Sequence, residues 1–305
     1  MSERALVCVL GQTRAHKLTW DSFEKNVLSE LNADLAVCIG IDDTYDYDNP
    51  YFKNAKFRWL LREPEDYLAE LERIRLCLGY LEDWRILLTI GGHFFGGIAQ
   101  TKGSGGISLI FRWLLRDAIL RGRLAERYDR FVITRSDFIY EAPHPPLDAL
   151  DPGFIWLPDG ENHGGLVDRH WVLNPADAVQ SQGIIEDMLR DPQQWAREIE
   201  KRPEVIRNIE STIKIYFTKH WLLSRVRRFP YFMFAARGDD DPTRWAVGFQ
   251  SPEHNFRIKY PAEYELVQKN KAHFTSSADW KAWAQKTNPT LTPDAYFSDT
   301  SPTQR

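Results

Sequence analysis

The first forty residues constrain the fold more than any other part of the chain. An apolar run at residues 5–10 ends at Gly11, residues 20–31 repeat apolar side chains at helical spacing, and a second apolar run covers residues 35–41. Short runs of this kind are typical of strands buried on both faces. A strand, a helix and a second strand in this order predict two parallel strands. We therefore expect an α/β protein whose central sheet is mostly parallel, Rossmann-like and flanked by helices.

The rest of the chain continues the alternation. We expect further strands at residues 85–90, 130–135, 154–157, 171–173 and 229–237, and helices at 65–79, 107–120, 183–190 and 207–222, with another opened by Asn174 and Pro175. Residues 1–285 are expected to form one domain that ends in C-terminal helices. The Thr, Pro and Ser content of residues 286–305 predicts a loose tail.

Charge and hydropathy exclude several classes of protein. The net charge of −4 does not favour the basic surface by which proteins hold nucleic acid, so no nucleic-acid partner is expected. No run reaches the roughly 18 apolar residues of a membrane-spanning helix, and the first residues lack a secretory signal. We therefore expect a cytoplasmic protein. Contact with a membrane that carries a lipid-linked substrate would be peripheral.

Polar clusters follow the expected strands where ligands bind in open α/β sheets, at the carboxyl ends. The four clusters are residues 11–14, 42–43, 134–137 and 164–169. Arg14 and Arg135 suit a diphosphate, because a guanidinium matches phosphate oxygens and keeps its charge. The glycine-rich residues 91–106 form a loop long enough to close over a ligand, but they lack the order of a P-loop. Motifs of serine hydrolases and zinc proteases are also absent from the sequence.

Six segments in a consistent order resemble a family of bacterial and viral glycosyltransferases. They are LGQTRAHKLTWDSFEKNVL at 10–28, KGSGGISLIFRWLLRDAI at 102–119, ITRSDFIY at 133–140, IWLPDGENHGGLVDRHWVLNP at 155–175, RNIESTIKIYF at 207–217 and the aromatic stretch that ends at Arg237. The resemblance covers roughly residues 4–238 and implies the GT-A fold, which binds nucleotide sugars. In that fold an Asp-x-Asp motif holds a divalent metal and the diphosphate of the donor.

This chain departs from the Asp-x-Asp motif, because Arg135-Ser136-Asp137 stands in its place. Two routes to a bound diphosphate stay open. Asp137 can hold Mn²⁺ or Mg²⁺ through oxygen, or Arg135 can neutralise the phosphates directly. A third interpretation is an ordinary turn in which Asp137 accepts hydrogen bonds from backbone amides.

The resemblance and the strand ends together assign roles to individual residues. We expect Asp168 to act as the catalytic base, with a structural Asp168–Arg169 pair as the alternative. The candidates for donor binding are Gly11, Arg14, Asp42, Ser104, Arg135 and Asp137, and those for acceptor or sugar binding are His163, Gly164, Gly165 and Arg169. Glu210 is interpreted as a helix cap or an indirect contributor as readily as a substrate contact. The acidic run 239–241 is interpreted as a solvated turn.

The expected function is transfer of a sugar from a UDP-, GDP- or dTDP-sugar to a glycan, a lipid-linked sugar or another hydroxyl acceptor. Two alternatives remain. One is a carbohydrate- or nucleotide-binding protein without catalysis, and the other is a nucleotidyltransferase, which would release pyrophosphate. The donor, the acceptor, retention or inversion at the anomeric carbon, and the oligomeric state stay open.

Overall fold

The computed structural model describes residues 3–238, 248–251 and 254–287. Seven strands form a central sheet in the order β3-β2-β1-β4-β7-β6-β8. They are β1 Ala5–Gly11, β2 Asp34–Ile41, β3 Phe57–Arg62, β4 Arg130–Thr134, β6 Ile155–Asp159, β7 Trp171–Leu173 and β8 Val226–Pro230. The acidic run 239–241 and nearly all of the expected tail lie outside the described residues.

The sheet is mostly parallel, as the sequence predicts. Strand β1 pairs in parallel with β2 on one side and β4 on the other, and β2 pairs in parallel with β3. Strand β7 runs against both of its neighbours, β4 and β6, whereas β6 and β8 are parallel. The carboxyl ends of β1 to β4 therefore lie along one edge of the sheet.

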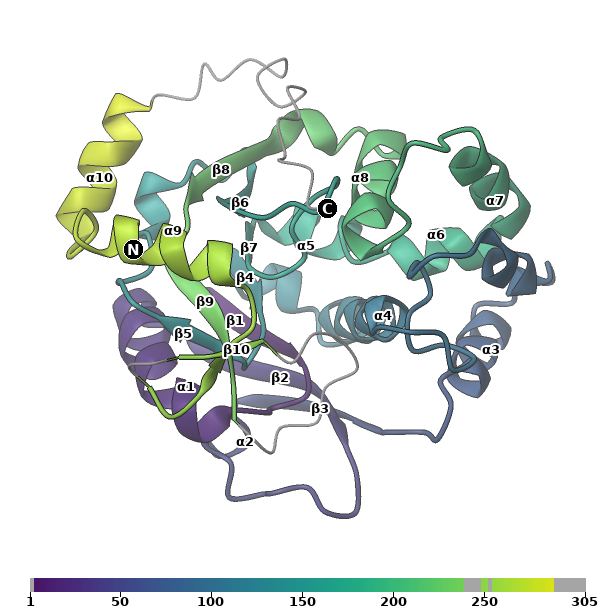
Figure 1. The fold of residues 1–305 in the computed structure, drawn as a ribbon, viewed down its shortest axis with the longest axis horizontal. Helices are drawn as coiled ribbons and strands as arrows, with labels where there is room; N and C mark the ends of the chain where they lie inside the picture. Colours follow the sequence, from purple (N-terminus) through teal and green to yellow (C-terminus); the bar gives the residue numbers. More distant parts are fainter. Residues whose placement is uncertain (1–2, 239–247, 252–253, 288–305) are drawn as a thin grey trace.

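Side-chain alternation along β1 divides the core into two layers. Leu6, Cys8 and Leu10 face one hydrophobic cluster, and Ala5, Val7 and Val9 face the other. Successive side chains of a strand point to opposite faces, so a strand without polar residues is buried on both. Helices cover the sheet on both sides (Figure 1).

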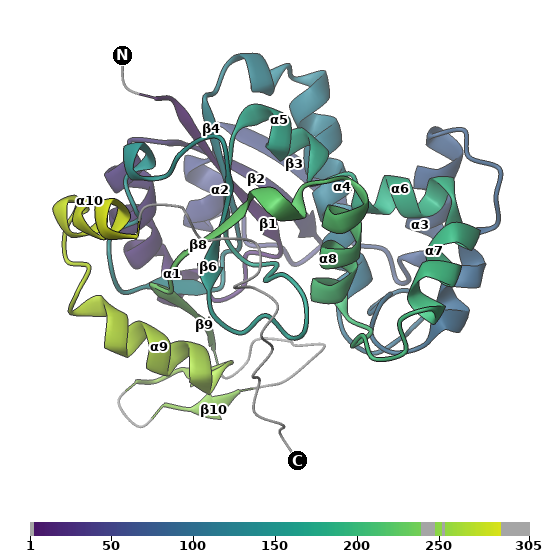
Figure 2. The same cartoon turned by 90° about the horizontal axis from the view of Figure 1, so that it is seen from above.

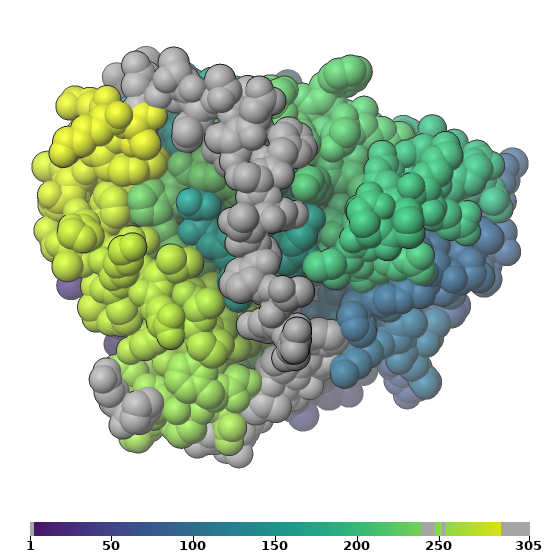
Figure 3. All heavy atoms as spheres, turned by 45° about the horizontal axis from the view of Figure 1, so that its top comes forward, coloured from purple at the N-terminus to yellow at the C-terminus, as the bar shows by residue number. Residues whose placement is uncertain are grey.

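The helices of the first layer are α3 Leu68–Cys77, α4 Gly105–Arg121, α5 Pro175–Gln180, α6 Ile184–Arg190, α7 Pro192–Glu200 and α8 Ile209–Lys219. The second layer holds α1 His16–Phe23 with a π-helical continuation Glu24–Ser29, α2 Pro50–Asn54, α9 Pro261–Lys271 and α10 Ser277–Lys286. It also contains a small sheet of β5 Phe138–Tyr140, β9 Met233–Arg237, β10 Phe249–Gln250 and β11 Arg257–Ile258. Helices α9 and α10 lie on the opposite side of the molecule from α6 to α8 (Figures 2 and 3).

Several local features differ from the sequence-based expectations, and three of them concern expected or missed strands. The prediction of a strand at 85–90 is wrong, because Trp84–Ile90 forms a 3-10 helix. Its buried side chains, Trp84, Leu87 and Ile90, recur every three residues, as the 3-10 geometry requires. The expected strand 229–237 is two strands, β8 and β9, in different sheets. Strand β3 was not expected, since an edge strand with alternating exposure lacks a continuous apolar run. Across the described residues, every helix is too short or too polar to cross a membrane.

Candidate functional site

A continuous cleft runs along the edge where β1 to β4 end. It consists of three adjoining cavities. A small central cavity shares Gln12, Arg14 and Glu63 with a cavity of about 510 Å³ on one side. On the other side it shares Ser104, Ser108 and Arg135 with a cavity of about 320 Å³. The first three sequence clusters thus meet at one edge, because parallel strands place their carboxyl ends together.

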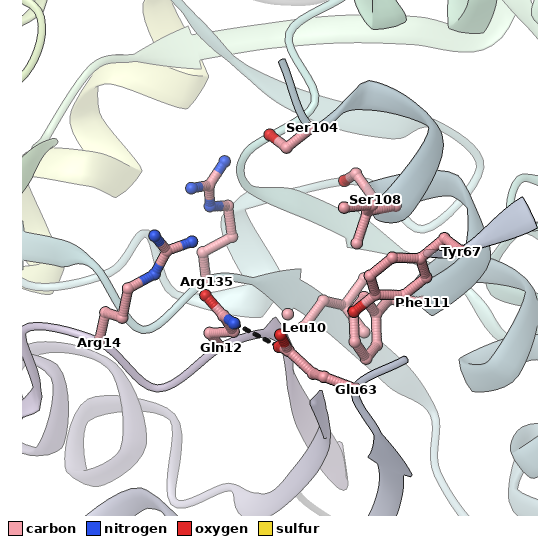
Figure 4. Close-up of a pocket in the computed structure, with 11 residues that line it drawn as sticks. Leu10, Gln12, Arg14, Glu63, Tyr67, Ser104, Ser108, Phe111 and Arg135 are labelled. Atoms are coloured by element: carbon pink, nitrogen blue, oxygen red, sulfur yellow. Dashed lines mark hydrogen bonds between the residues drawn. The ribbon is translucent and has the colours of Figure 1, made fainter. Parts of the chain in front are cut away.

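The central cavity is dominated by two arginines, and we call Gln12, Arg14, Glu63 and Arg135 the arginine edge. Arg14 and Arg135 extend into the same space, facing Ser104 at the start of α4 (Figure 4). Burial and the neighbouring cations Arg237 and Arg135 lower the pKa of Arg14 to about 10, although Asp137 opposes the shift. Crowding of like charges on half-buried guanidinium groups favours the binding of an anion.

Asp137 lies behind this edge with its carboxylate already neutralised. Arg135 donates to it at 2.8 and 3.1 Å, and Arg237 donates to the same carboxylate. Burial alone would raise the pKa of Asp137, but Arg135, Arg237 and Lys259 outweigh it and hold the pKa well below its usual range. Three cations around one carboxylate fit a resident divalent metal poorly. This arrangement favours direct pairing of arginines with phosphate, which is the second of the two ways of binding a diphosphate that the sequence left open.

The cavity of about 320 Å³ collects the acids and bases of the fourth cluster, and we call it the carboxylate cavity. Its charged and aromatic lining includes Arg135, His163, Asp168, Arg169, Glu210, Lys259 and Tyr260. Burial would raise the pKa of Asp168, yet the net shift is downward because of Arg135, Arg169, Arg112 and Lys259. Asp168 is therefore held as a carboxylate.

Arg169 connects the two sides of the carboxylate cavity. Its guanidinium lies 4.2 Å from the centre of the Tyr260 ring, forms an ion pair with buried Glu263 and contacts His163 at 3.3 Å. Glu161, His163 and Glu263 offer three possible metal-ligand atoms within 4.8 Å of one another. The carboxylate oxygens suit Mn²⁺, whereas the imidazole nitrogen is typical of Zn²⁺ or iron sites, and Arg169 competes for Glu263.

Glu210 and Lys259 have the most unusual environments in this cavity. Burial and the charge of Asp168 raise the pKa of Glu210 to about 7. Burial and the cations Arg135 and Arg237 lower the pKa of Lys259 to about 7, against the opposing effect of Asp137. Groups that titrate near neutral pH in a cleft are candidates for proton transfer and for charge-dependent binding.

The structure brings most of the predicted residues together. Gly11, Arg14, Ser104, Arg135, His163, Asp168 and Arg169 line the central or carboxylate cavity. Asp42 lines the cavity of about 510 Å³, where Thr44 donates two hydrogen bonds to it. Asp137, Gly164 and Gly165 support the walls: a side chain at Gly165 would overlap the backbone of Glu210, and Gly164 has a φ of +79°.

Glu63 and Lys259 are among the contributors that sequence reasoning missed. Glu63 follows β3, whose alternating pattern FRWLLR was the available signal. Lys259 follows β11 and reaches the cavity through pairing of β11 with β9, a contact between distant segments that leaves no local pattern. The chain matches no protein-family model and no curated protein.

Proposed function

We propose that this protein is a glycosyltransferase that moves a sugar from a nucleotide sugar to a hydroxyl acceptor. One observation carries the proposal: two half-buried arginines at the strand edge stand between a larger cavity and a cavity that contains ionisable carboxyl groups. A nucleotide-sugar transferase needs these three parts in this order, for the nucleoside, the diphosphate and the reacting sugar.

The cavity of about 510 Å³ suits the nucleoside. It is lined by the polar side chains of Thr13, Asp42, Tyr45 and Asn49. Asn49 donates to the Thr13 hydroxyl at 2.8 Å, and the same hydroxyl lies 3.0 Å from the Tyr45 hydroxyl. Such a wall, fixed by its own hydrogen bonds, can offer donors and acceptors to a ribose or a base.

The diphosphate belongs at the arginine edge. Arg14 and Arg135 supply charge that does not depend on pH in the neutral range, and Ser104 adds a hydroxyl at the start of α4. When the bond between sugar and diphosphate breaks, negative charge grows on the leaving oxygen. Guanidinium groups already in place stabilise that charge without reorganisation.

A divalent cation has one group of residues that fits it in the described part of the chain. Glu161, His163 and Glu263 would hold it through one nitrogen and carboxylate oxygens, and the cation would supply further positive charge beside the donor sugar. The arginine edge provides charge neutralisation independently of that group.

Calorimetric titration with UDP-, GDP- and dTDP-sugars, each with and without Mn²⁺, tests the proposal. We expect one nucleotide to bind, with loss of affinity in Arg14→Gln. Asp137→Asn and His163→Ala separate the two metal hypotheses, because only the variant that removes a ligand eliminates the Mn²⁺-dependent part. Absence of binding by any donor to the folded protein contradicts the proposal.

A further inference from the structure

Glu210 is a buried carboxyl group that the sequence analysis left without a defined role. It is the second residue of α8, only 8% exposed, and it lines the carboxylate cavity. The Asn208 side chain caps the helix by accepting from the Ser211 amide at 2.9 Å. Asn208 therefore provides the cap, while the Glu210 carboxyl group accepts from its own backbone amide and lines the cavity.

The glycine pair of the 164–169 segment places Glu210 beside Asp168. The Leu166 amide donates to the Glu210 carbonyl at 3.0 Å, and Asn208 donates to the His163 carbonyl at 2.9 Å. A side chain at Gly165 would overlap the backbone of Glu210 and Ser211. The absence of a side chain at Gly165 thus lets α8 begin directly against the segment that carries Asp168.

The two carboxyl groups differ in the charges around them. Arg112 donates a hydrogen bond to the backbone carbonyl of Asp168, and the Arg169 guanidinium lies 3.9 Å from the Asp168 carboxylate. The charged and titratable groups that surround Glu210 or face it across the cavity are Asp168, Arg169, Lys259, His163, His93, Arg135 and Tyr260. Burial raises the pKa of Glu210 most, repulsion by Asp168 raises it further, and neither Arg169 nor Lys259 alone lowers it as strongly as Asp168 raises it. A base works best when its pKa lies near the working pH, and Glu210 meets that condition whereas Asp168 does not.

We propose that Glu210 is the general base of the transfer reaction and that Asp168 remains ionised as its positioning partner. The inference rests on the proposed function. The Glu210 carboxylate takes the proton of the acceptor hydroxyl, and the oxygen uses the freed electron pair to bond to the anomeric carbon. The bond from that carbon to the diphosphate oxygen breaks, and its electron pair leaves with the nucleoside diphosphate at the arginine edge.

The test is the pH dependence of kcat in four proteins: wild type, Glu210→Gln, Glu210→Asp and Asp168→Asn, each with its thermal stability and donor Kd. In the wild type kcat rises with pH through about 7, because the base must lose its proton. Glu210→Gln lowers kcat by about 10²- to 10⁴-fold and removes this rise, while the donor Kd is unchanged. Glu200→Gln, on an exposed position of α7, is the matched control and behaves as the wild type.

Asp168→Asn gives a result that a purely structural role of Glu210 does not predict. Removing the repelling charge lowers the pKa of Glu210, so the rise in kcat moves to lower pH. A neutral Lys259 acting as the base would also make kcat rise with pH, so Lys259→Met is measured beside Glu210→Gln. The rise is expected to persist in Lys259→Met, and its loss there would overturn the role of Glu210. If Glu210→Gln does not fold, Glu210→Asp carries the test, with reduced kcat and a retained rise.

The outcomes separate the two proposals. Transfer by the wild type together with loss of the rise in Glu210→Gln supports both. Two outcomes overturn the role of Glu210 and leave the glycosyltransferase proposal standing. In one, Glu210→Gln transfers sugar and its kcat still rises with pH. In the other, the rise of kcat with pH is lost only in Asp168→Asn. A folded wild type that transfers no sugar overturns both.

Discussion

The arginine edge and the carboxylate cavity adjoin one another but are built by different means. Arg14 and Arg135 follow two neighbouring parallel strands, so sheet topology alone brings them together. Glu210 and Lys259 come from α8 and from the end of β11, and only packing between distant segments joins them. The arginine edge offers permanent charge, whereas the carboxylate cavity offers groups that gain or lose a proton near neutral pH. The comparison indicates that binding of an anion and transfer of a proton can be altered separately.

Arg14→Gln should have the largest effect, and this effect should be confined to the arginine edge. Loss of a charged hydrogen-bonding group of this kind costs roughly 1.5–3 kcal/mol, so the donor Kd should rise about 10- to 150-fold. The pH at which kcat rises should stay unchanged, because Arg14 is not among the charges that shift Glu210. Arg121→Gln, at the exposed end of α4, is the matched control for titration calorimetry. An equal loss of affinity in both variants would contradict a specific role of Arg14.

Acid unfolding must be distinguished from protonation of Glu210. His144 and His170 are buried with their Nε2 atoms 3.1 Å apart, and burial lowers the pKa of His144 from 6.5 to about 4. Between pH 4 and pH 6.5, His144 therefore binds a proton in the unfolded chain but not in the folded chain. The resulting stability is complete above pH 6.5 and decreases by about 3 kcal/mol as the pH falls to 4.

Urea unfolding at a series of pH values measures this effect. His144→Asn should reduce the acid loss of stability by about that amount, whereas exposed His273→Asn should leave it unchanged. An unchanged slope in His144→Asn would exclude the histidine pair as its source. Because the His144 contribution is complete above pH 6.5, the histidine pair does not produce a rise in kcat near pH 7.

Gly165→Ala should disturb the carboxylate cavity and spare the arginine edge. The added methyl group would overlap the backbone of Glu210, and overpacking of this kind costs about 1–3 kcal/mol. We expect a lower free energy of unfolding and a lower kcat, with the donor Kd within about twofold of the wild type. In Gly153→Ala, where the added group meets only the Asp151 side chain, stability should change by less than about 0.5 kcal/mol. A weaker donor Kd in Gly165→Ala would show that the two regions are not independent.

Lys259 provides the smallest and most specific signal. An amine with a pKa of about 7 is roughly half protonated at pH 7, and a bound diphosphate should raise its pKa. Donor binding should then take up as much as about half a proton at Lys259, measured by calorimetry in buffers of different ionisation enthalpy. Lys259→Met should remove that part, and exposed Lys25→Met should not. Equal uptake in the wild type and in Lys259→Met would exclude Lys259 as the group that responds.

The sequence predicted the parts of this molecule that depend on local pattern. Apolar runs defined β1, β2 and β4, and their ends located Gly11, Arg14, Asp42 and Arg135 at one edge. It failed where spacing is ambiguous, since the apolar residues of Trp84–Ile90 fit a strand as readily as the 3-10 helix that forms. It also provided no signal for Lys259, because the pairing of β11 with β9 is a long-range contact. The role of Asp168 as a base stays a prediction. Glu210 is a second candidate for that role, and its burial and neighbouring charges, which make it one, are not visible in the sequence.

The most direct test of the account is product analysis by mass spectrometry after incubation with each nucleotide sugar and a panel of hydroxyl acceptors. The account predicts release of a nucleoside diphosphate together with an acceptor heavier by one sugar residue. Release of pyrophosphate from a nucleoside triphosphate would instead indicate a nucleotidyltransferase. Donor binding with no product from any acceptor would contradict the account in favour of a binding protein.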